Sequence, residues 1–235
     1  MRSALALKAL VTSCLAVVLT PAAAARADTA DAPDPGAFTL NGTAAFVTAT
    51  GNPDRARVLR LTGGGFRQAG SAWATDQVDV TLSFDTTFVA YLHRGTRGAD
   101  GIAFLLQRSG PRALGGWGGG LGYRGVKNSV AVEFDDFRNV GDPAGDHVGL
   151  VLNNNPDFHA AVAETPEPLF GRPFRARITY DAGSHRLTVA VDGRQLIQQT
   201  VDLAAHLGGN LAWAGFTGAT GESVSKQDIR SWSGF

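Results

Sequence analysis

Apolar and polar residues alternate with a period of two along several stretches of this chain. Between residues 78 and 85 every second residue is apolar, which predicts a strand with one buried face. The same alternation covers residues 174–180 and 187–191, on either side of the turn residues 181–184. Two such runs joined by a short turn predict a β-hairpin.

Two other runs, residues 102–106 and 130–132, are apolar at every position. Such runs are typical of central strands that are covered on both faces. Only residues 202–207 suggest a helical turn. With 30 glycines and many turns between short strands, the pattern predicts an all-β fold, in which two antiparallel sheets pack as a β-sandwich.

The first residues have the composition of a secretory leader. Arg2 and Lys8 precede an apolar run over residues 9–19, and Ala-Arg-Ala follows at 25–27, as at a signal-peptide cleavage site. Lys8 and Pro21 leave fewer than the roughly 20 unbroken apolar residues that a membrane span needs. We therefore expect a signal peptide over residues 1–27, a secreted protein and no membrane span.

After the leader, residues 28–36 predict a short linker and residues 37–235 one domain. The 44% apolar composition is enough for a single core, and the 21 basic residues balance 21 acidic ones, so nucleic acid is not expected as a partner. The single cysteine, Cys14, lies inside the leader. The mature chain then has no disulfide and relies on its core or on bound metal. Lipid attachment at Cys14 is a minor alternative, since most of the apolar run follows it.

Carboxylates concentrate where the second apolar run ends. Glu133 and Asp135 are alternate residues of one strand, so their side chains share a face about 6.5 Å apart, a spacing that a cation could bridge. Asn139 and Asp142 follow in a loop that can fold back, and His147 adds a nitrogen donor. Oxygen donors suit calcium, and carboxylates with one histidine suit manganese or a similar ion. The alternative is a solvated surface loop.

The order of these residues resembles the metal loop of the legume-type (L-type) lectins, which are concanavalin A-like jelly rolls. That family reads Val-Glu-Phe-Asp-Thr-Phe-x-Asn, then Asp-Pro, then His-Ile-Gly-Ile. This chain reads Val-Glu-Phe-Asp-Asp-Phe-Arg-Asn over 132–139, Asp-Pro at 142–143 and His-Val-Gly-Leu over 147–150. Asp136 stands where threonine is usual. The resemblance implies a secreted, bacterial-style member of the family.

By position, the resemblance implies two metal sites. The transition metal, Mn²⁺ or a similar ion, would be held by Glu133, Asp135, Asp142 and His147. Ca²⁺ would be held by Asp135, Asn139, Asp142 and the main-chain oxygen of Phe137.

Three further segments resemble the same family in the same order. Ala-Asp-Gly at 99–101 resembles the segment whose aspartate follows a cis peptide bond and accepts hydrogen bonds from sugar. The glycine tract over 115–122 and Gly-Phe-Thr-Gly-Ala-Thr-Gly over 215–221 resemble two other binding loops. Each could also be an ordinary turn, loop or hairpin. The sugar contacts implied are Asp100, Gly119, Phe137, Asn139, Glu222 and Ser223.

A glycoside hydrolase on a similar sandwich is the alternative function. Laminarinase-type jelly rolls carry Glu-x-Asp-x-x-Glu, but Arg138 occupies the last position here, and a tighter spacing would end on Phe137. Retaining hydrolysis needs two carboxyl groups about 5 Å apart, one of them a proton donor, and metal ligation would keep Glu133 and Asp135 ionised. We therefore expect a non-enzymatic lectin that binds carbohydrate.

A third possible function is a structural surface module in which metal only stabilises the fold. The presence of Asp100 and the glycine tract disfavours it. The remaining histidines have no acid or nucleophile at useful spacing and are predicted to be surface or turn residues: His93, His159, His185 and His206. The sequence leaves open which sugar is bound and whether the chain forms a homo-oligomer.

Overall fold

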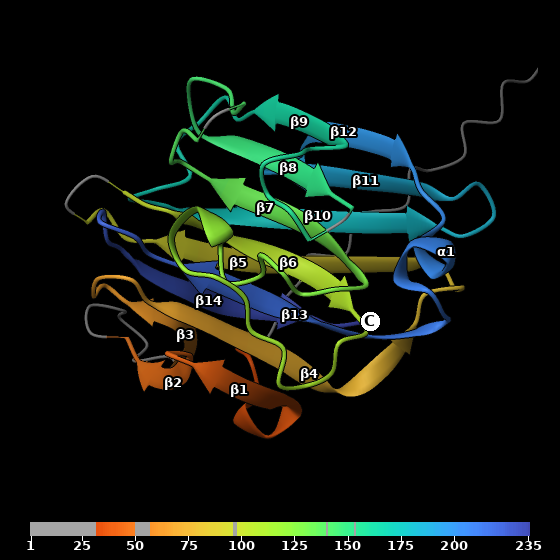
Figure 1. Cartoon of the computed structure of the whole chain (residues 1–235), viewed down its shortest axis with the longest axis horizontal. Coiled ribbons are helices and arrows are strands. Elements are labelled where there is room, and N and C mark those ends of the chain that lie inside the picture. The colour runs from red at the N-terminus through yellow and green to blue at the C-terminus, as the bar shows by residue number, and fades with distance from the viewer. Residues whose placement is uncertain (1–31, 50–56, 96–97, 140, 153) are drawn as a thin grey trace, which may run out of the picture.

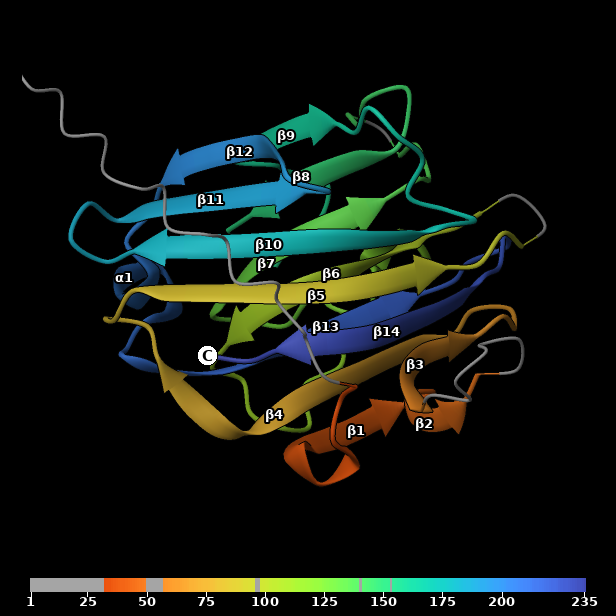
Figure 2. The same cartoon turned by 180° about the vertical axis from the view of Figure 1, so that it is seen from behind.

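The computed structural model describes residues 32–49, 57–95, 98–139, 141–152 and 154–235. In this part of the chain, two seven-stranded sheets pack face to face (Figures 1 and 2), and every strand pairing within them is antiparallel. The predicted all-β sandwich is confirmed. The signal peptide predicted over residues 1–27 lies outside the described residues.

The front sheet, nearer the viewer in Figure 1, has the strand order β1 (Phe38–Gly42), β4 (Ala69–Asp79), β13 (Leu211–Ala219), β6 (Gly101–Gln107), β7 (Ser129–Asp135), β8 (His147–Val151) and β9 (Ala161–Glu164). The back sheet has the order β12 (Arg194–Thr200), β11 (Arg186–Val191), β10 (Pro173–Asp181), β5 (Phe84–Leu92), β14 (Lys226–Ser233), β3 (Arg57–Gly63) and β2 (Ala45–Thr48).

The two continuously apolar runs form β6 and β7, which lie side by side in the front sheet with every residue buried. Their inner face packs on the back sheet, where Phe88 has ring contacts with Phe104 of β6 and Phe134 of β7, at centroid distances of 6.3 and 5.4 Å. Their outer face is covered by Leu121 and Tyr123 of the long β6–β7 connection. Strands with two covered faces need no polar side, so the prediction of central strands is confirmed.

The predicted hairpin is formed by β10 and β11, with Ile178 opposite Val189. The strand predicted over residues 78–85 is wrong. β4 ends at Asp79 and β5 begins at Phe84, with a turn between them. Val80 is 1% exposed although it lies in the turn, whereas Leu82 is 62% exposed. Because Val80 is apolar and reaches the core from the turn, the alternation of apolar and polar residues continues through the point where the chain reverses.

The described helices are short. α1 (Leu203–Leu207) forms the predicted helical turn, and the Asp202 side chain caps it by accepting a hydrogen bond from Ala205 N. The 3-10 helix η1 (Pro35–Ala37) is capped by Asp34, at the end of the segment predicted as a linker. A second 3-10 helix, η2 (Gly118–Gly120), lies in the glycine tract. No helix of the described residues is long and apolar enough to cross a membrane.

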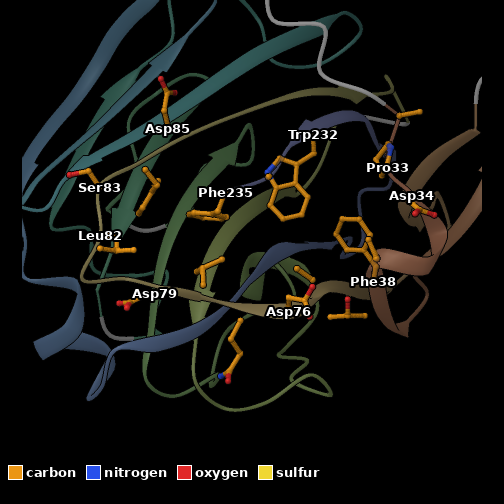
Figure 3. Close-up of a pocket in the computed structure, with 18 residues that line it drawn as sticks. Pro33, Asp34, Phe38, Asp76, Asp79, Leu82, Ser83, Asp85, Trp232 and Phe235 are labelled. Carbon is orange, nitrogen blue, oxygen red and sulfur yellow. The ribbon is translucent and has the colours of Figure 1, made fainter.

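A cavity of about 770 Å³ lies at one end of the sandwich, and the rings of Phe38, Trp232 and Phe235 line it (Figure 3). Strand register places this cavity far from the carboxylate loop. Asp79, which lines the cavity, pairs with the first residue of β13, and Ala219 at the other end of β13 pairs with Gly101. The cavity and the candidate functional site described next are therefore at opposite ends of the front sheet.

Candidate functional site

The carboxylate loop begins where β7 meets β8. Asp135 lies opposite His147 and Glu133 lies opposite Gly149 in the antiparallel register. Alternate residues of a strand share a face, and Ala131 contacts the β6–β7 connection, so Glu133 and Asp135 project from the outer face of the front sheet. Both side chains are nevertheless buried, with exposed fractions of 1% and 2%.

Glu133 is held from two sides. Its Oε1 accepts a hydrogen bond from the Tyr123 hydroxyl, and its Oε2 lies 2.7 Å from His159 Nε2. Gly149 makes room for this arrangement, because a Cβ there would lie 2.8 Å from Glu133 Oε2 and 2.7 Å from His159 Nε2. The orientation of Glu133 is thus set by an aromatic residue from the long connection and by a histidine from the β8–β9 loop.

His159 is not the surface or turn residue that the sequence predicted. Its side chain is 7% exposed, and the hydrogen bond to Glu133 raises its pKa despite the opposing effect of burial. Its Nδ1 lies 4.0 Å from Asp142 Oδ1, and His147 Nε2 lies 3.9 Å from the same oxygen. One potential ligand atom from each of these three residues lies within 4.8 Å of the others. No local motif marks His159, since its contact with Glu133 spans 26 residues.

His93 was also predicted to lie on the surface or in a turn without an acidic partner. Its Nε2 lies 2.8 Å from Asp228 Oδ2, and its side chain is 29% exposed. That contact is in the back sheet, on β14, and therefore belongs to the scaffold.

The loop after β7 folds back on itself through its own carboxylates. Asp135 Oδ1 accepts a hydrogen bond from Phe137 N at 2.7 Å, and Asp142 Oδ2 accepts one from Asn139 N at 2.7 Å. The Asn139 amide donates to the main-chain oxygen of Phe137 at 3.3 Å. The oxygen donors that the resemblance assigns to calcium therefore lie along one loop, which also leads from Glu133 to His147.

The electrostatics of this cluster favour a cation. Burial and then the charge of Glu133 raise the pKa of Asp135 well above its ordinary value, although the Phe137 hydrogen bond lowers it. Among the described residues, the ion pairs to Glu133 and Asp142 come from histidines. Buried carboxylates are costly unless a positive charge compensates them. A donor set of carboxylate oxygens, an amide oxygen and imidazole fits Ca²⁺ and a transition metal.

Asp136, which stands in place of the usual threonine, lies in a different environment. Burial and then a hydrogen bond with Asp146 raise its pKa to about 7, and Arg94 opposes this shift. These side chains line a second pocket of about 420 Å³. Asp136 is thus associated with Asp146 rather than with the ligand cluster.

Asp100 lies immediately before β6, and the peptide bond that joins it to Ala99 is cis. Its side chain is buried, and its Oδ2 has no hydrogen-bond partner in the described structure. Burial raises the pKa of Asp100 to about 6, against the lowering effect of the Gly221 backbone. Its main chain joins two other loops, because Asp100 N donates to Ala219 O at 3.1 Å and its own oxygen accepts from Asp136 N at 3.3 Å.

The glycine tract lies beside Asn139. A Cβ on Gly119 would lie 2.8 Å from Asn139 Oδ1, and a Cβ on Gly221 would lie 3.4 Å from Asp100 Oδ2. The glycine tract and the loop after β13 are joined by a hydrogen bond from Gly118 N to Thr220 O at 3.0 Å. Asp100, Gly119 and Asn139, which are up to 39 positions apart in the sequence (139 − 100), therefore belong to one set of contacting loops.

The last predicted contact residues, Glu222 and Ser223, follow β13. The Glu222 carboxylate is 76% exposed and lies 2.6 Å from the guanidinium of Arg67, while Ser223 O accepts a hydrogen bond from Gly221 N at 3.2 Å. Arg67 also lies over the ring of Trp117, 4.9 Å from its centroid. Sequence reasoning assigned no role to Arg67 or Trp117. Exposed aromatic residues in a glycine tract were the available signal for Trp117, but Arg67 comes from the distant β3–β4 loop.

The family model of the legume lectin beta-barrel domain matches residues 31–233. This chain belongs to the L-type lectin family. A lectin from Onobrychis viciifolia is 35% identical over 168 residues, which cover 67% of this chain and 69% of that protein. Lectin 8 from Medicago truncatula is 38% identical over 118 residues, which cover 44% of this chain and 42% of the relative.

Solved structures agree with the family. The basic winged bean lectin with Tn-antigen has a TM-score of 0.71 at 25% identity, covering 86% of this chain and 93% of that chain. The Bauhinia forficata lectin in complex with GalNAc has a TM-score of 0.69 at 29% identity, covering 85% and 92%. This chain is thus a non-enzymatic, carbohydrate-binding lectin with a β-sandwich fold, as predicted. These relatives are plant lectins, so the expected bacterial-style membership is not borne out.

Proposed function

We propose that this L-type lectin is secreted and binds its glycan in a metal-dependent way, through the loops that meet at Asp100, Gly119 and Asn139. The observation that carries the proposal is Asp100 Oδ2, a buried carboxylate oxygen without a hydrogen-bond partner among the described residues. It lies beside Gly221, in the loop that bonds to the glycine tract through Thr220. Leaving such an oxygen unpaired costs about 1–3 kcal/mol. A sugar hydroxyl would satisfy it.

The loops that meet near that oxygen carry the groups that we expect to contact the sugar. Asp100 would accept from a hydroxyl, the Asn139 amide would donate, and the backbone N–H of Gly119 would approach closely because no Cβ intervenes. The ring of Phe137 is 42% exposed and offers an apolar face to the C–H side of a sugar. Glu222 and Ser223 would border the site, together with Arg67, which pairs with Glu222 and covers the Trp117 ring.

Metal ions would fix this arrangement without needing to touch the sugar. Bound Ca²⁺ and Mn²⁺, or a similar transition metal, would neutralise the buried carboxylates and hold the loop conformation. Glu133, Asp135, Asp142 and His147 would hold the transition metal, with Asp135 and Asp142 shared with calcium. Asn139 and the main-chain oxygen of Phe137 would complete the calcium ligands. In this role Asn139 couples metal binding to sugar binding.

Glycan binding is tested on an array, with the purified protein before and after treatment with a chelator. We expect binding that disappears on chelation and returns on adding Ca²⁺ and Mn²⁺ together. N-acetylgalactosamine glycans are the first probes, because two structural neighbours are described with GalNAc and with Tn-antigen. Binding that ignores chelation would contradict the metal dependence. The Asp100→Asn variant should fold normally and bind no glycan.

The same loops give no support to hydrolysis. A retaining glycosidase needs a proton donor and a nucleophile about 5 Å apart, whereas both carboxyl oxygens of Glu133 are already engaged, one by Tyr123 and the other by His159. Release of reducing ends from a β-glucan, abolished by Glu133→Gln, would reverse this conclusion.

Secretion is supported by the leader-like composition of residues 1–27. Expression of the full chain in a secreting host is expected to yield a mature protein in the medium that begins at residue 28, as read by N-terminal sequencing. Retention of the leader on a cell-associated protein would contradict this part of the proposal.

A further inference from the structure

His159 is buried in the same cluster as the residues proposed to hold the transition metal. Its Nε2 lies 2.7 Å from Glu133 Oε2, and its Nδ1 lies 4.0 Å from Asp142 Oδ1. The ring meets that of His147 edge-on at a centroid distance of 5.8 Å. Two imidazoles and two carboxylates therefore converge on one volume at the outer face of β7 and β8.

The local structure is shaped to receive this ring. His159 lies one residue before Ala160, whose N–H bonds to Leu150 O at 2.7 Å, so the β8–β9 loop returns to the edge of β8. There Gly149 has no side chain, and a Cβ at that position would lie 2.7 Å from His159 Nε2. Any other residue at 149 would push the histidine away from Glu133.

We infer that His159 is a direct ligand of the transition metal, together with Glu133, Asp142 and His147, and that this second imidazole makes the site select Zn²⁺ over Mn²⁺. The inference rests on the proposed function in one respect, namely that this cluster holds a metal. It departs from the ligand set expected from the resemblance, which contains a single histidine, because His159 takes the place of Asp135 and leaves Asp135 to calcium alone.

The selectivity follows from donor chemistry. Imidazole nitrogen suits zinc, whereas manganese favours carboxylate, carbonyl and water oxygens. Two histidines with two carboxylates supply the four donors that zinc commonly takes in tetrahedral geometry. Replacing oxygen donors by a second imidazole should therefore strengthen zinc binding more than manganese binding.

A weaker role for His159 is that of a hydrogen-bond donor that orients Glu133 without touching the metal. The structure argues against this, because Tyr123 already holds the other oxygen of Glu133 and the second ring nitrogen of His159 faces Asp142. An orienting residue would influence both metals alike, typically by 10- to 100-fold. A ligand with a nitrogen donor would influence them unequally.

The experiment compares the metal affinities of the whole protein and two variants after removal of metal with a chelator. His159→Gln keeps a side chain that can donate a hydrogen bond to Glu133, but it removes the imidazole. His159→Asn is measured alongside, so that the result does not depend on the folding of a single variant. His185→Asn is the matched control, since His185 is exposed in the β10–β11 turn with φ near 51°, where asparagine is well tolerated.

Zn²⁺ and Mn²⁺ affinities are measured by competition with a chromophoric chelator, and Co²⁺ absorption reports the coordination. We expect both His159 variants to lose more than about 100-fold in Zn²⁺ affinity and less than about tenfold in Mn²⁺ affinity. The Co²⁺ spectrum should weaken in both, and the control should match the natural chain. Unchanged Zn²⁺ affinity, an equal loss for both metals, or a natural chain that binds neither metal would overturn the inference.

Glycan binding is recorded on the same samples and separates this inference from the proposed function. Chelator-sensitive glycan binding with no effect of His159→Gln on Zn²⁺ affinity would sink the inference alone. The expected loss of Zn²⁺ affinity in a protein that binds no glycan would sink the proposed function alone.

Discussion

Gly119 lies so close to Asn139 that a Cβ on residue 119 would sit 2.8 Å from Asn139 Oδ1. The glycine tract can thus approach the carboxylate loop this closely because residue 119 has no side chain. Because Asn139 is proposed to serve both calcium and sugar, a change at Gly119 should affect binding far more than folding.

Gly119→Ala is therefore expected to weaken glycan binding by about tenfold or more, a loss of about 1.4 kcal/mol. The added methyl group would displace the Asn139 amide, while the flexible side chain absorbs the clash without unfolding the protein. The matched control is Gly116→Ala in the same tract, where the nearest atom would be Arg124 Cβ at 3.8 Å. Calorimetric titration and thermal unfolding check both variants, and equal glycan affinities would contradict the prediction.

Tyr123→Phe removes the hydroxyl that donates to Glu133 Oε1 and keeps the ring in the core. We expect transition-metal affinity to fall by about 10- to 100-fold, as for other residues that orient a ligand. Chelator competition measures the loss. Tyr91→Phe is the control, because Tyr91 lies on β5 of the back sheet under Arg230, whereas Glu133 lies on the front sheet. A variant with unchanged metal affinity would show that Glu133 is positioned by other groups.

Asp228 is a buried carboxylate whose charge is compensated by neighbouring side chains. Burial would raise its pKa, but hydrogen bonds from Arg60 and His93 outweigh that effect and lower it. The folded pKa is therefore below the unfolded value of about 3.9. Its contribution to stability is present above about pH 4 and is lost as pH falls through the folded pKa.

Asp228→Asn should accordingly lower the free energy of unfolding at pH 7 by about 3 kcal/mol, since Arg60 is left without its partner in a largely buried site. The difference from the natural chain should shrink in acid. Asp85→Asn is the comparison, because the Asp85–Arg177 pair is about half exposed and should contribute less than about 1 kcal/mol. Denaturant unfolding across pH measures both, and equal losses in the two variants would refute the argument.

Arg67→Ala releases the Glu222 carboxylate and uncovers the Trp117 ring. The exposed Arg67–Glu222 pair should contribute less than about 1 kcal/mol to folding, so thermal stability should change little. The glycan profile on an array is expected to change, because three groups that border the site lose their mutual contacts. Lys226→Ala is an exposed cationic control beyond the same loop. Identical profiles for the natural chain and Arg67→Ala would exclude Arg67 from recognition.

Local pattern was sufficient for several elements of the fold. The fully apolar runs became β6 and β7 because only a strand covered on both faces tolerates such a run, and the β10–β11 hairpin followed from alternation on both sides of a turn. The strand predicted over residues 78–85 failed for a physical reason. Val80 is buried from within a turn, so alternation continued across a reversal that periodicity cannot detect.

By itself, then, the sequence determined the two-sheet architecture and the order of the carboxylates after β7, because strand periodicity and motif spacing are local properties. Only the tertiary structure decided which distant side chains join the site. His159 reaches Glu133 over 26 positions, and Arg67 reaches Glu222 over 155. Such contacts depend on how loops return to a sheet edge and on where a glycine leaves room. Neither property can be predicted from the sequence separation of the residues in contact.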